Sequence, residues 1–220
     1  MKIIVTGTSR GIGKRAAERY ITEGHFVYGI DKNDGVIESE NYKHFKADIR
    51  YKDRLPDITD AEVLFNNAGL QNSEDDIENN LKGTINVTEK YIRSNAKLKS
   101  VLFNASSSAV TGQEFPVYSA SKAGLIGYMK NTAIRLAPRG VTVNAISPGG
   151  VYTPLNDVVV NDKECFQKIM DVTPLKKWMT ADEVADWVLF LTLKNRSMSG
   201  QNLLIDNGEY DLNYRFVWKD

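Results

Sequence analysis

Short apolar runs alternate with longer amphipathic stretches along most of the chain. Each run contains mainly valine, isoleucine, leucine and phenylalanine, and each ends at a glycine, asparagine, aspartate or serine. A short continuous apolar run with such an end is typical of a buried β-strand. The runs therefore predict seven strands, at residues 2–7, 26–31, 44–48, 62–69, 99–107, 141–150 and 202–208.

The stretches between these runs have apolar residues at helical spacing. In residues 11–24, Ile12, Ala16 and Tyr20 recur every four residues, and Gly24 is typical of a helix C-cap. Further helices are predicted at about 75–95, from 117 to about 140, and at 180–191. The last begins with a Thr-x-x-Glu capping box.

Strands this apolar, with helices between them, predict a parallel sheet that is covered on both faces. Right-handed crossovers then produce a single doubly wound, Rossmann-like α/β sheet of seven parallel strands. We find no linker or repeat, so we expect residues 1–220 to form one domain. Residues 151–177 lack a strong period and are the best candidate for a mobile segment.

Composition narrows the class of protein further. The chain of 220 residues has 28 Lys and Arg against 28 Asp and Glu, which provides no electrostatic basis for binding nucleic acid or an anionic membrane. The lone cysteine, Cys165, cannot form an internal disulfide and favours a reducing, cytoplasmic location. No apolar run reaches the ~18–20 residues that span a bilayer. The start of the chain does not have the pattern of a signal peptide. His25 and His44 lack neighbouring ligand residues, so no metal is expected.

A glycine-rich turn, TGTSRGIG at residues 6–13, joins the first predicted strand to the first helix. Glycine lets the backbone turn sharply and approach a ligand, and a helix N-terminus attracts phosphate. The next strand ends at Asp31, where a carboxylate would accept hydrogen bonds from an adenosine ribose and repel a 2′-phosphate. This pattern favours NAD. Arg10 and Lys32 could pair with that phosphate, so NADP stays possible, and a purely structural turn is the alternative to both.

Tyr118 and Lys122 stand four residues apart in a predicted helix, so their side chains share one face. A phenol has a reference pKa near 10, and a nearby ammonium lowers that pKa. A tyrosine tuned in this way could act as the general acid that carbonyl reduction needs. Without other motifs, the same spacing would indicate only a surface pair.

Four motifs in order resemble the short-chain dehydrogenase/reductase family. They are TGTSRGIG at 6–13, NNAG at 66–69, YSASK at 118–122 and SPGG at 147–150, and the resemblance covers almost the whole chain. It implies an oxidoreductase that transfers hydride between NAD(H) and a ketone or secondary alcohol. The region between residues 48 and 66 is short for the family, which predicts that its third helix is reduced to a turn.

The resemblance also implies catalytic roles. Tyr118 would exchange a proton with the substrate oxygen, and Lys122 would lower the pKa of Tyr118 and hold the nicotinamide ribose. Asn80 matches the asparagine of the family's proton relay, with Asn79 beside it as a bystander. The second serine of the Asn-x-Ser-Ser pattern selects Ser107 to orient the substrate. The gap to Tyr118 is shorter than usual, which leaves Ser106 as a competitor.

Cofactor contacts follow from the same matching. The turn, the strand ends and the loop after the sixth strand would supply them: Gly7, Ser9, Arg10, Gly11, Ile12, Gly13, Asp31, Asp48, Ile49, Asn67, Ala68, Gly69, Tyr118, Lys122, Pro148, Gly149, Val151 and Thr153. Asp48 and Ile49 would contact adenine, and Pro148, Gly149 and Val151 would flank the nicotinamide.

Further expectations concern the lid, the substrate, the alternative functions, the oligomeric state and the C-terminal tail. Residues 151–177 match the segment that covers the substrate in the family, so we expect a lid there. The substrate is a small carbonyl compound or alcohol of unspecified kind. An NADPH-dependent 3-oxoacyl-thioester reductase is the enzyme alternative, and a non-catalytic NAD-binding sensor or scaffold is the other. The family implies a homodimer or homotetramer. The aromatic tail, residues 210–220, would pack on a partner subunit or on its own surface.

Overall fold

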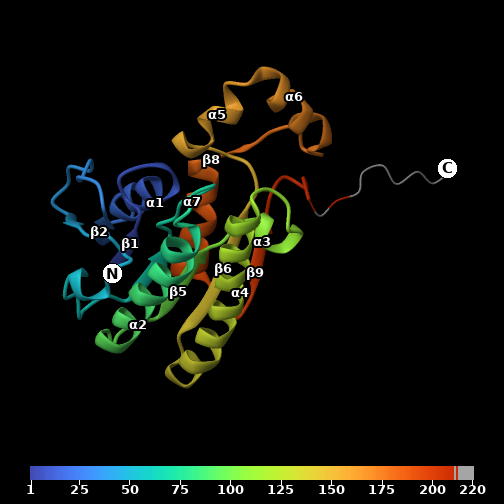
Figure 1. Ribbon diagram of the computed structural model, residues 1–220. Helices are drawn as coiled ribbons and strands as arrows, with labels where there is room; N and C mark the ends of the chain where they lie inside the picture. Colours follow the sequence, from blue (N-terminus) through green and yellow to red (C-terminus); the bar gives the residue numbers. More distant parts are fainter. Residues whose placement is uncertain (211, 213–220) are drawn as a thin grey trace.

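The computed structural model describes residues 1–210 and 212, and its centre is a seven-stranded parallel sheet (Figure 1). The strand order is β3-β2-β1-β4-β5-β6-β9. The strands are β1 Lys2–Thr6, β2 Phe26–Asp31, β3 Tyr42–Lys46, β4 Val63–Asn66, β5 Ser100–Asn104, β6 Thr142–Pro148 and β9 Asn202–Ile205. The order reverses between β1 and β4, as in the doubly wound fold that the sequence predicts. The fold class is therefore confirmed.

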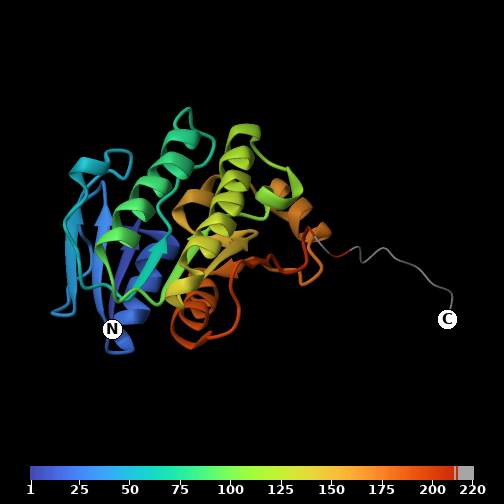
Figure 2. The ribbon, with the colours of Figure 1, turned by 90° about the horizontal axis from the view of Figure 1, so that it is seen from below.

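Helices cover both faces of this sheet. They are α1 Gly11–Thr22, α2 Thr84–Ser94, α3 Ser108–Thr111, α4 Pro116–Leu136, α5 Asp157–Val160, α6 Lys163–Val172 and α7 Ala181–Leu189. Figure 2 shows α2 and α4 on one side of the sheet and α1 and α7 on the other. None of the helices in the described residues is long and apolar enough to cross a membrane.

Three elements differ from the sequence prediction or refine it. The third strand pairs two residues earlier than expected, at Tyr42–Lys46, because its register with β2 aligns Tyr42 with Val27. A 3-10 turn, η1 (Lys52–Arg54), stands in place of the family's third helix, which confirms the predicted shortening. The predicted helix at 75–95 begins as a π-helix, η2 (Ile77–Gly83), and continues as α2.

The core has two parts because neighbouring side chains of a strand point to opposite faces. On β1, Ile4 contributes to the cluster under α2 and α4, whereas Ile3 and Val5 contribute to the cluster under α1 and α7. Met129 of α4 and Val188 of α7 are fully buried in these two clusters. A large apolar area leaves water on both faces, and this burial is the main stabilising contribution.

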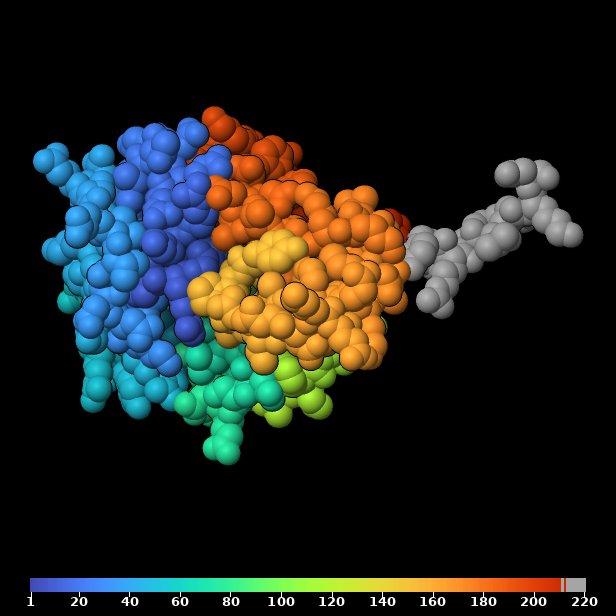
Figure 3. Space-filling model, turned by 90° about the horizontal axis from the view of Figure 1, so that it is seen from above, coloured from blue at the N-terminus to red at the C-terminus, as the bar shows by residue number. Residues whose placement is uncertain are grey.

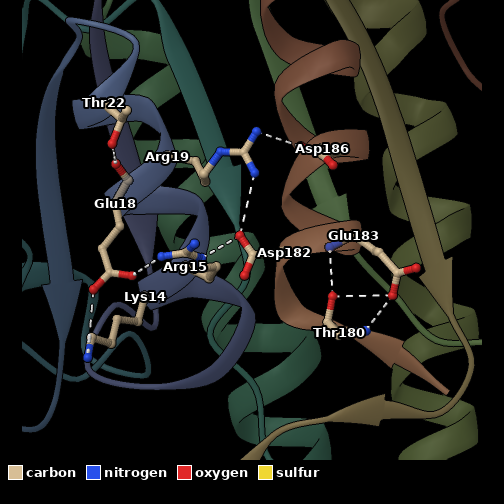
Figure 4. A network of polar contacts seen from close by, with 9 residues as sticks. All are labelled: Lys14, Arg15, Glu18, Arg19, Thr22, Thr180, Asp182, Glu183 and Asp186. Atoms are coloured by element: carbon tan, nitrogen blue, oxygen red, sulfur yellow. Dashed lines mark hydrogen bonds and ion pairs between the residues drawn. The ribbon is translucent and has the colours of Figure 1, made fainter.

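Ion pairs connect α1 to α7 at the surface (Figure 4). Arg15 Nε donates to Asp182 Oδ1 at 2.6 Å, and Arg19 donates to Asp186 Oδ1 at 2.6 Å. At the start of α7, Thr180 and Glu183 form the capping box that the sequence predicts. Exposed ion pairs contribute little to stability, so the apolar contact of these helices matters more.

Residues 151–177 extend over the carboxyl edge of the sheet, where α5 and α6 stand above β8 (Met179–Thr180) in Figure 1. The same segment covers the centre of the molecule in Figure 3. Three aromatic side chains join its ends: Tyr152, Phe166 and Trp178 have ring centroids 5.1–6.0 Å apart. Residues 151–177 therefore cover this edge of the sheet, and movement of the segment stays a prediction. The aromatic tail was expected to pack on a partner subunit or on its own surface. Except for Tyr210 and Leu212, its residues lie outside the described part of the chain.

Candidate active site

A cavity of about 400 Å³ opens at the carboxyl edge of the sheet. Its walls come from the glycine turn after β1, the ends of β2, β4 and β5, the start of α4, the loop after β6 and the covering segment. All strands of a parallel sheet end at one edge, so loops distant in sequence meet there. Of the predicted site residues, all but Ser9, Gly13, Asn80 and Ser107 line this cavity.

The glycine turn is shaped by close backbone packing. Gly7 has φ +77°, and a Cβ there would lie 2.8 Å from Asn67 Nδ2. A Cβ on Gly13 would lie 2.1 Å from the carbonyl oxygen of Gly7. Gly13 is therefore needed to pack α1 against the turn rather than to touch a ligand. The turn leaves a concave backbone surface at the start of α1, which fits a pyrophosphate.

Asp31 lies at the end of β2 on the cavity wall. Its carboxylate accepts hydrogen bonds from the Ser9 backbone N–H at 3.0 Å and from the Asn33 backbone N–H at 2.9 Å. Ser9 thus does not line the cavity itself, but its backbone N–H helps to hold Asp31 there. These bonds hold the carboxylate in place, and its remaining lone pairs can accept ribose hydroxyls.

Asp48 and Ile49 follow β3 and also line the cavity. Arg50 donates three hydrogen bonds to the Asp48 side chain, and the guanidinium holds the pKa of that carboxyl below its usual range. Arg50 also donates to Asp75 at 2.7 Å. This guanidinium therefore connects the predicted adenine contact to the segment just before η2.

Tyr118 and Lys122 lie in the first turns of α4 and line the same cavity as the glycine turn. Pro116 occupies the first helical position, where its missing N–H costs nothing. Lys122 Nζ donates to the Asn104 carbonyl oxygen at 2.8 Å and lies 5.7 Å from the centre of the Tyr118 ring. Tyr118 is 8 % exposed and Lys122 is 4 % exposed.

Burial dominates the acidity of both groups. It raises the pKa of Tyr118 well above its ordinary value, and a hydrogen bond from Ser106 lowers it in part. Burial also lowers the pKa of Lys122 to about 8, while Asp76 acts in the opposite direction. The expectation that Lys122 lowers the Tyr118 pKa is therefore not met here, because both groups have lost water and Lys122 bonds to Asn104 instead. Tyr118 is a neutral phenol at neutral pH, the form that donates a proton.

We expect Lys122→Met to stabilise the fold at pH 7 by about 3 kcal/mol, since each pKa unit is worth about 1.4 kcal/mol. The folded pKa of Lys122, about 8, lies below the ordinary lysine value of 10.5. Below pH 8 both the folded and the unfolded state carry the charge, and the folded state bears the full cost of burying it. As pH rises from 8 to 10.5 the folded protein loses its proton first, so the wild type gains stability. Urea unfolding at several pH values should show the difference between variant and wild type shrinking in that range.

The structure separates the two competing serines. Ser106 lines the cavity and interacts with the Tyr118 hydroxyl. Ser107 is fully buried and does not line the cavity, and its hydroxyl has no hydrogen-bond partner among the described residues. Ser107 is the residue before α3, and its φ of −55° and ψ of −35° are already helical. The geometry favours Ser106 over the Ser107 that the family pattern selects, because the loop before Tyr118 is shorter.

Asn80 lies behind the cavity wall rather than on it, and is fully buried. Its Oδ1 accepts from the Leu70 N–H at 2.7 Å, and its Nδ2 donates to Ser121 Oγ at 3.1 Å. A Cβ on Gly69 would lie 3.3 Å from Lys122 Nζ and 3.4 Å from Asn80 Oδ1. Asn80 thus holds the loop that contacts Lys122. Asn79, which the sequence marks as a bystander, lines the cavity.

The polar residues of the cavity wall that the sequence reasoning missed include Glu114, Glu209 and Tyr210. Glu114 precedes α4, and the other two follow β9. Only their position could have indicated them, because each lies close in sequence to a motif of the site. Among the described residues, no group of three or more His, Cys, Asp or Glu could hold a metal ion.

Comparisons with known proteins agree with this geometry. The sequence model of a family described as Enoyl-(Acyl carrier protein) reductase matches residues 7–209. The chain is 31% identical to the 3-oxoacyl-[acyl-carrier-protein] reductase FabG of Buchnera aphidicola subsp. Acyrthosiphon pisum, over 94% of this chain and 96% of that protein. Among solved structures, the aldohexose dehydrogenase of Thermoplasma acidophilum is 25% identical, with a TM-score of 0.85 over 99% of this chain and 97% of that chain. An oxidoreductase from Burkholderia thailandensis is 27% identical, with a TM-score of 0.86 over 97% and 94%.

A doubly wound sheet with a glycine turn and a Tyr–Lys helix at its carboxyl edge defines an oxidoreductase of the dinucleotide-binding class. The chain belongs to the short-chain dehydrogenase/reductase family. It is an enzyme that acts on a CH–OH or carbonyl group.

Proposed function

We propose that this enzyme interconverts a ketone and a secondary alcohol with NAD(H), and that Tyr118 exchanges the proton. The observation that carries the proposal is the position of Tyr118: its side chain lines the cavity beside Ser106 and shares that cavity with the glycine turn. Ser106 would orient the substrate oxygen toward the phenol. Lys122 would hold ribose hydroxyls and supply positive charge, and Asn80 would keep the loop beside Lys122 in place.

The residues present fit a nicotinamide dinucleotide. The turn from Gly7 to Ile12 is concave backbone with room for phosphate, and Asp31 lies on the same wall. Pro148, Gly149 and Val151 line the other end, close to Tyr118. When bound, the dinucleotide supplies or accepts the hydride. The chain itself binds and orients the substrate, excludes water under residues 151–177, and moves one proton at the Tyr118 oxygen.

Asp31 supports NAD over NADP. A 2′-phosphate placed beside its carboxylate would be repelled, and like charges in contact cost several kcal/mol. Arg10 and Lys32 line the same wall and would favour that phosphate. The curated relatives are named as 3-oxoacyl-[acyl-carrier-protein] reductases, so thioester reduction with NADPH is the second candidate.

We expect Asp31→Ala to shift the ratio of the NADPH and NADH dissociation constants at least about tenfold toward NADPH, because the repulsive charge is gone. Binding is measured by cofactor fluorescence. Asp34→Ala is the matched control: Asp34 is three residues away, is exposed and pairs with Lys46. An unchanged ratio in Asp31→Ala, or tighter NADPH binding by the wild type, would contradict NAD specificity.

The remaining parts of the proposal concern organisation and setting. One domain with a cover that opens at residues 151–177 is supported by the position of α5 and α6 over the sheet edge (Figure 1). A homodimer or homotetramer is supported by the family resemblance, and its size is measured by light scattering. A cytoplasmic location is supported by the single cysteine. Turnover by the wild type would exclude a non-catalytic sensor or scaffold.

A further inference from the structure

The cavity continues past Tyr118 into a part with two unlike walls. Val159 and Ile169 of the covering segment, with Trp178 directly after it, form an apolar wall. Glu114, Glu209 and Tyr210 also line the cavity and form its polar wall. Tyr118 lines the same cavity, so a substrate with its reacting oxygen at Tyr118 would extend between these two walls.

The polar wall is held by its own contacts. The Tyr210 hydroxyl donates to Glu114 Oε1 at 3.5 Å. Glu114 lies in the turn before α4 and has φ +67°, a conformation that costs energy in a residue other than glycine. Glu209 follows β9 and lies against the loop after β6. A Cβ on Gly149 would be 3.4 Å from its Oε2, which is buried and has no hydrogen-bond partner among the described residues.

The two carboxyls differ in their surroundings: Glu114 is exposed at the cavity mouth, whereas Glu209 is half-buried and its Oε2 lacks a hydrogen-bond partner among the described residues. Burial raises the pKa of Glu209 to about 7, and Asp206 and Glu114 add to this effect. Burial also raises the pKa of Glu114, although Tyr210 donates to it and lowers that pKa in part. No lysine or arginine is among the groups that act on either carboxyl. A ligand that brings hydrogen-bond donors to this wall would recover the lost solvation.

We propose that Glu114, Glu209 and Tyr210 recognise hydroxyl groups next to the reacting carbon, so that the substrate is a neutral polyol or the matching hydroxyketone. This inference rests on the proposed function and gives it a substrate class. A hydroxyl can donate to a carboxylate and accept from the Tyr210 phenol or a protonated carboxyl, whereas an ammonium can only donate. A carboxylate substituent would be repelled, and a long acyl chain would leave the polar wall without partners.

The test compares alcohols that differ in one group, with NAD and purified protein. The probes are propane-1,2-diol, butane-2,3-diol and ribitol, against butan-2-ol, 3-hydroxybutyrate and 1-aminopropan-2-ol. We expect kcat/KM for the best polyol to exceed that for the other three at least about tenfold, as one or two hydrogen bonds to charged groups would give. Glu114→Gln and Glu209→Gln should each reduce this preference about tenfold, with cofactor binding unchanged.

Glu164→Gln is the matched control, since Glu164 is on α6 of the covering segment and pairs at the surface with Lys168. Tyr210→Phe, which removes only one hydroxyl, tests the same wall if a glutamine variant fails to fold. Preference of the wild type for the monoalcohol, the hydroxy acid or the amino alcohol would overturn the inference. So would a polyol preference that survives all three variants. A wild type that turns over no alcohol or ketone with either cofactor would instead contradict the proposed function.

Discussion

Replacing Tyr118 by Phe is expected to reduce kcat by about 10²–10⁴-fold, the usual contribution of a general acid or base. The phenol is buried, neutral and aimed into the cavity beside Ser106, and the described part of the cavity wall offers no other group in the same position. Phenylalanine keeps the ring and its packing but cannot donate or accept the proton. Initial rates of NADH formation and consumption measure the effect.

The same variant should bind NADH with nearly the affinity of the wild type, because the glycine turn and Asp31 are untouched. Tyr128→Phe is the matched control on α4. Its hydroxyl donates to Glu89 at 2.7 Å on the side of the helix away from the cavity, so turnover should stay close to that of the wild type. Equal loss in both variants would indicate damage to the helix, and unimpaired turnover in Tyr118→Phe would refute Tyr118 as the proton donor.

Ser106→Ala should reduce kcat about 10–100-fold, whereas Ser107→Ala should leave it within about threefold of the wild type. The first variant removes a hydroxyl that lines the cavity and hydrogen-bonds the phenol. A hydrogen bond to a group that becomes charged is worth about 1.5–3 kcal/mol, which corresponds to this range. The second variant removes a hydroxyl that lies behind the wall. The pair is matched, since the two serines are adjacent and both buried.

The pH dependence gives this comparison a second readout. The hydrogen bond from Ser106 lowers the pKa of Tyr118, so its loss should raise that pKa further. Alcohol oxidation requires the phenolate, and its rate should therefore rise at higher pH in Ser106→Ala than in the wild type. Ser107→Ala should retain the wild-type profile. The opposite ranking of the two variants would restore Ser107, the serine that the family pattern selects.

The parallel sheet and the cofactor turn were predictable because each depends on local pattern. Val5 and Ile4 belong to a continuous apolar run, and such runs in a chain with intervening helices have few alternatives to a parallel sheet. Gly7 and Gly13 mark positions where a side chain has no room, which the structure shows as contacts of 2.8 Å and 2.1 Å for an added Cβ. Helical spacing places Tyr118 and Lys122 on one face, and the accompanying family motifs distinguish them from a surface pair.

The sequence by itself thus determined the class of fold, the edge of the sheet at which the site lies and the Tyr–Lys pair, because periodicity and glycine positions act over a few residues. Only the tertiary structure decided between Ser106 and Ser107, placed Asn80 behind the wall and brought Glu114 next to Tyr210, 96 residues away. It also reversed the expected direction of the Tyr118 pKa. Burial and contacts between distant loops set these features, and neither can be read from neighbouring residues.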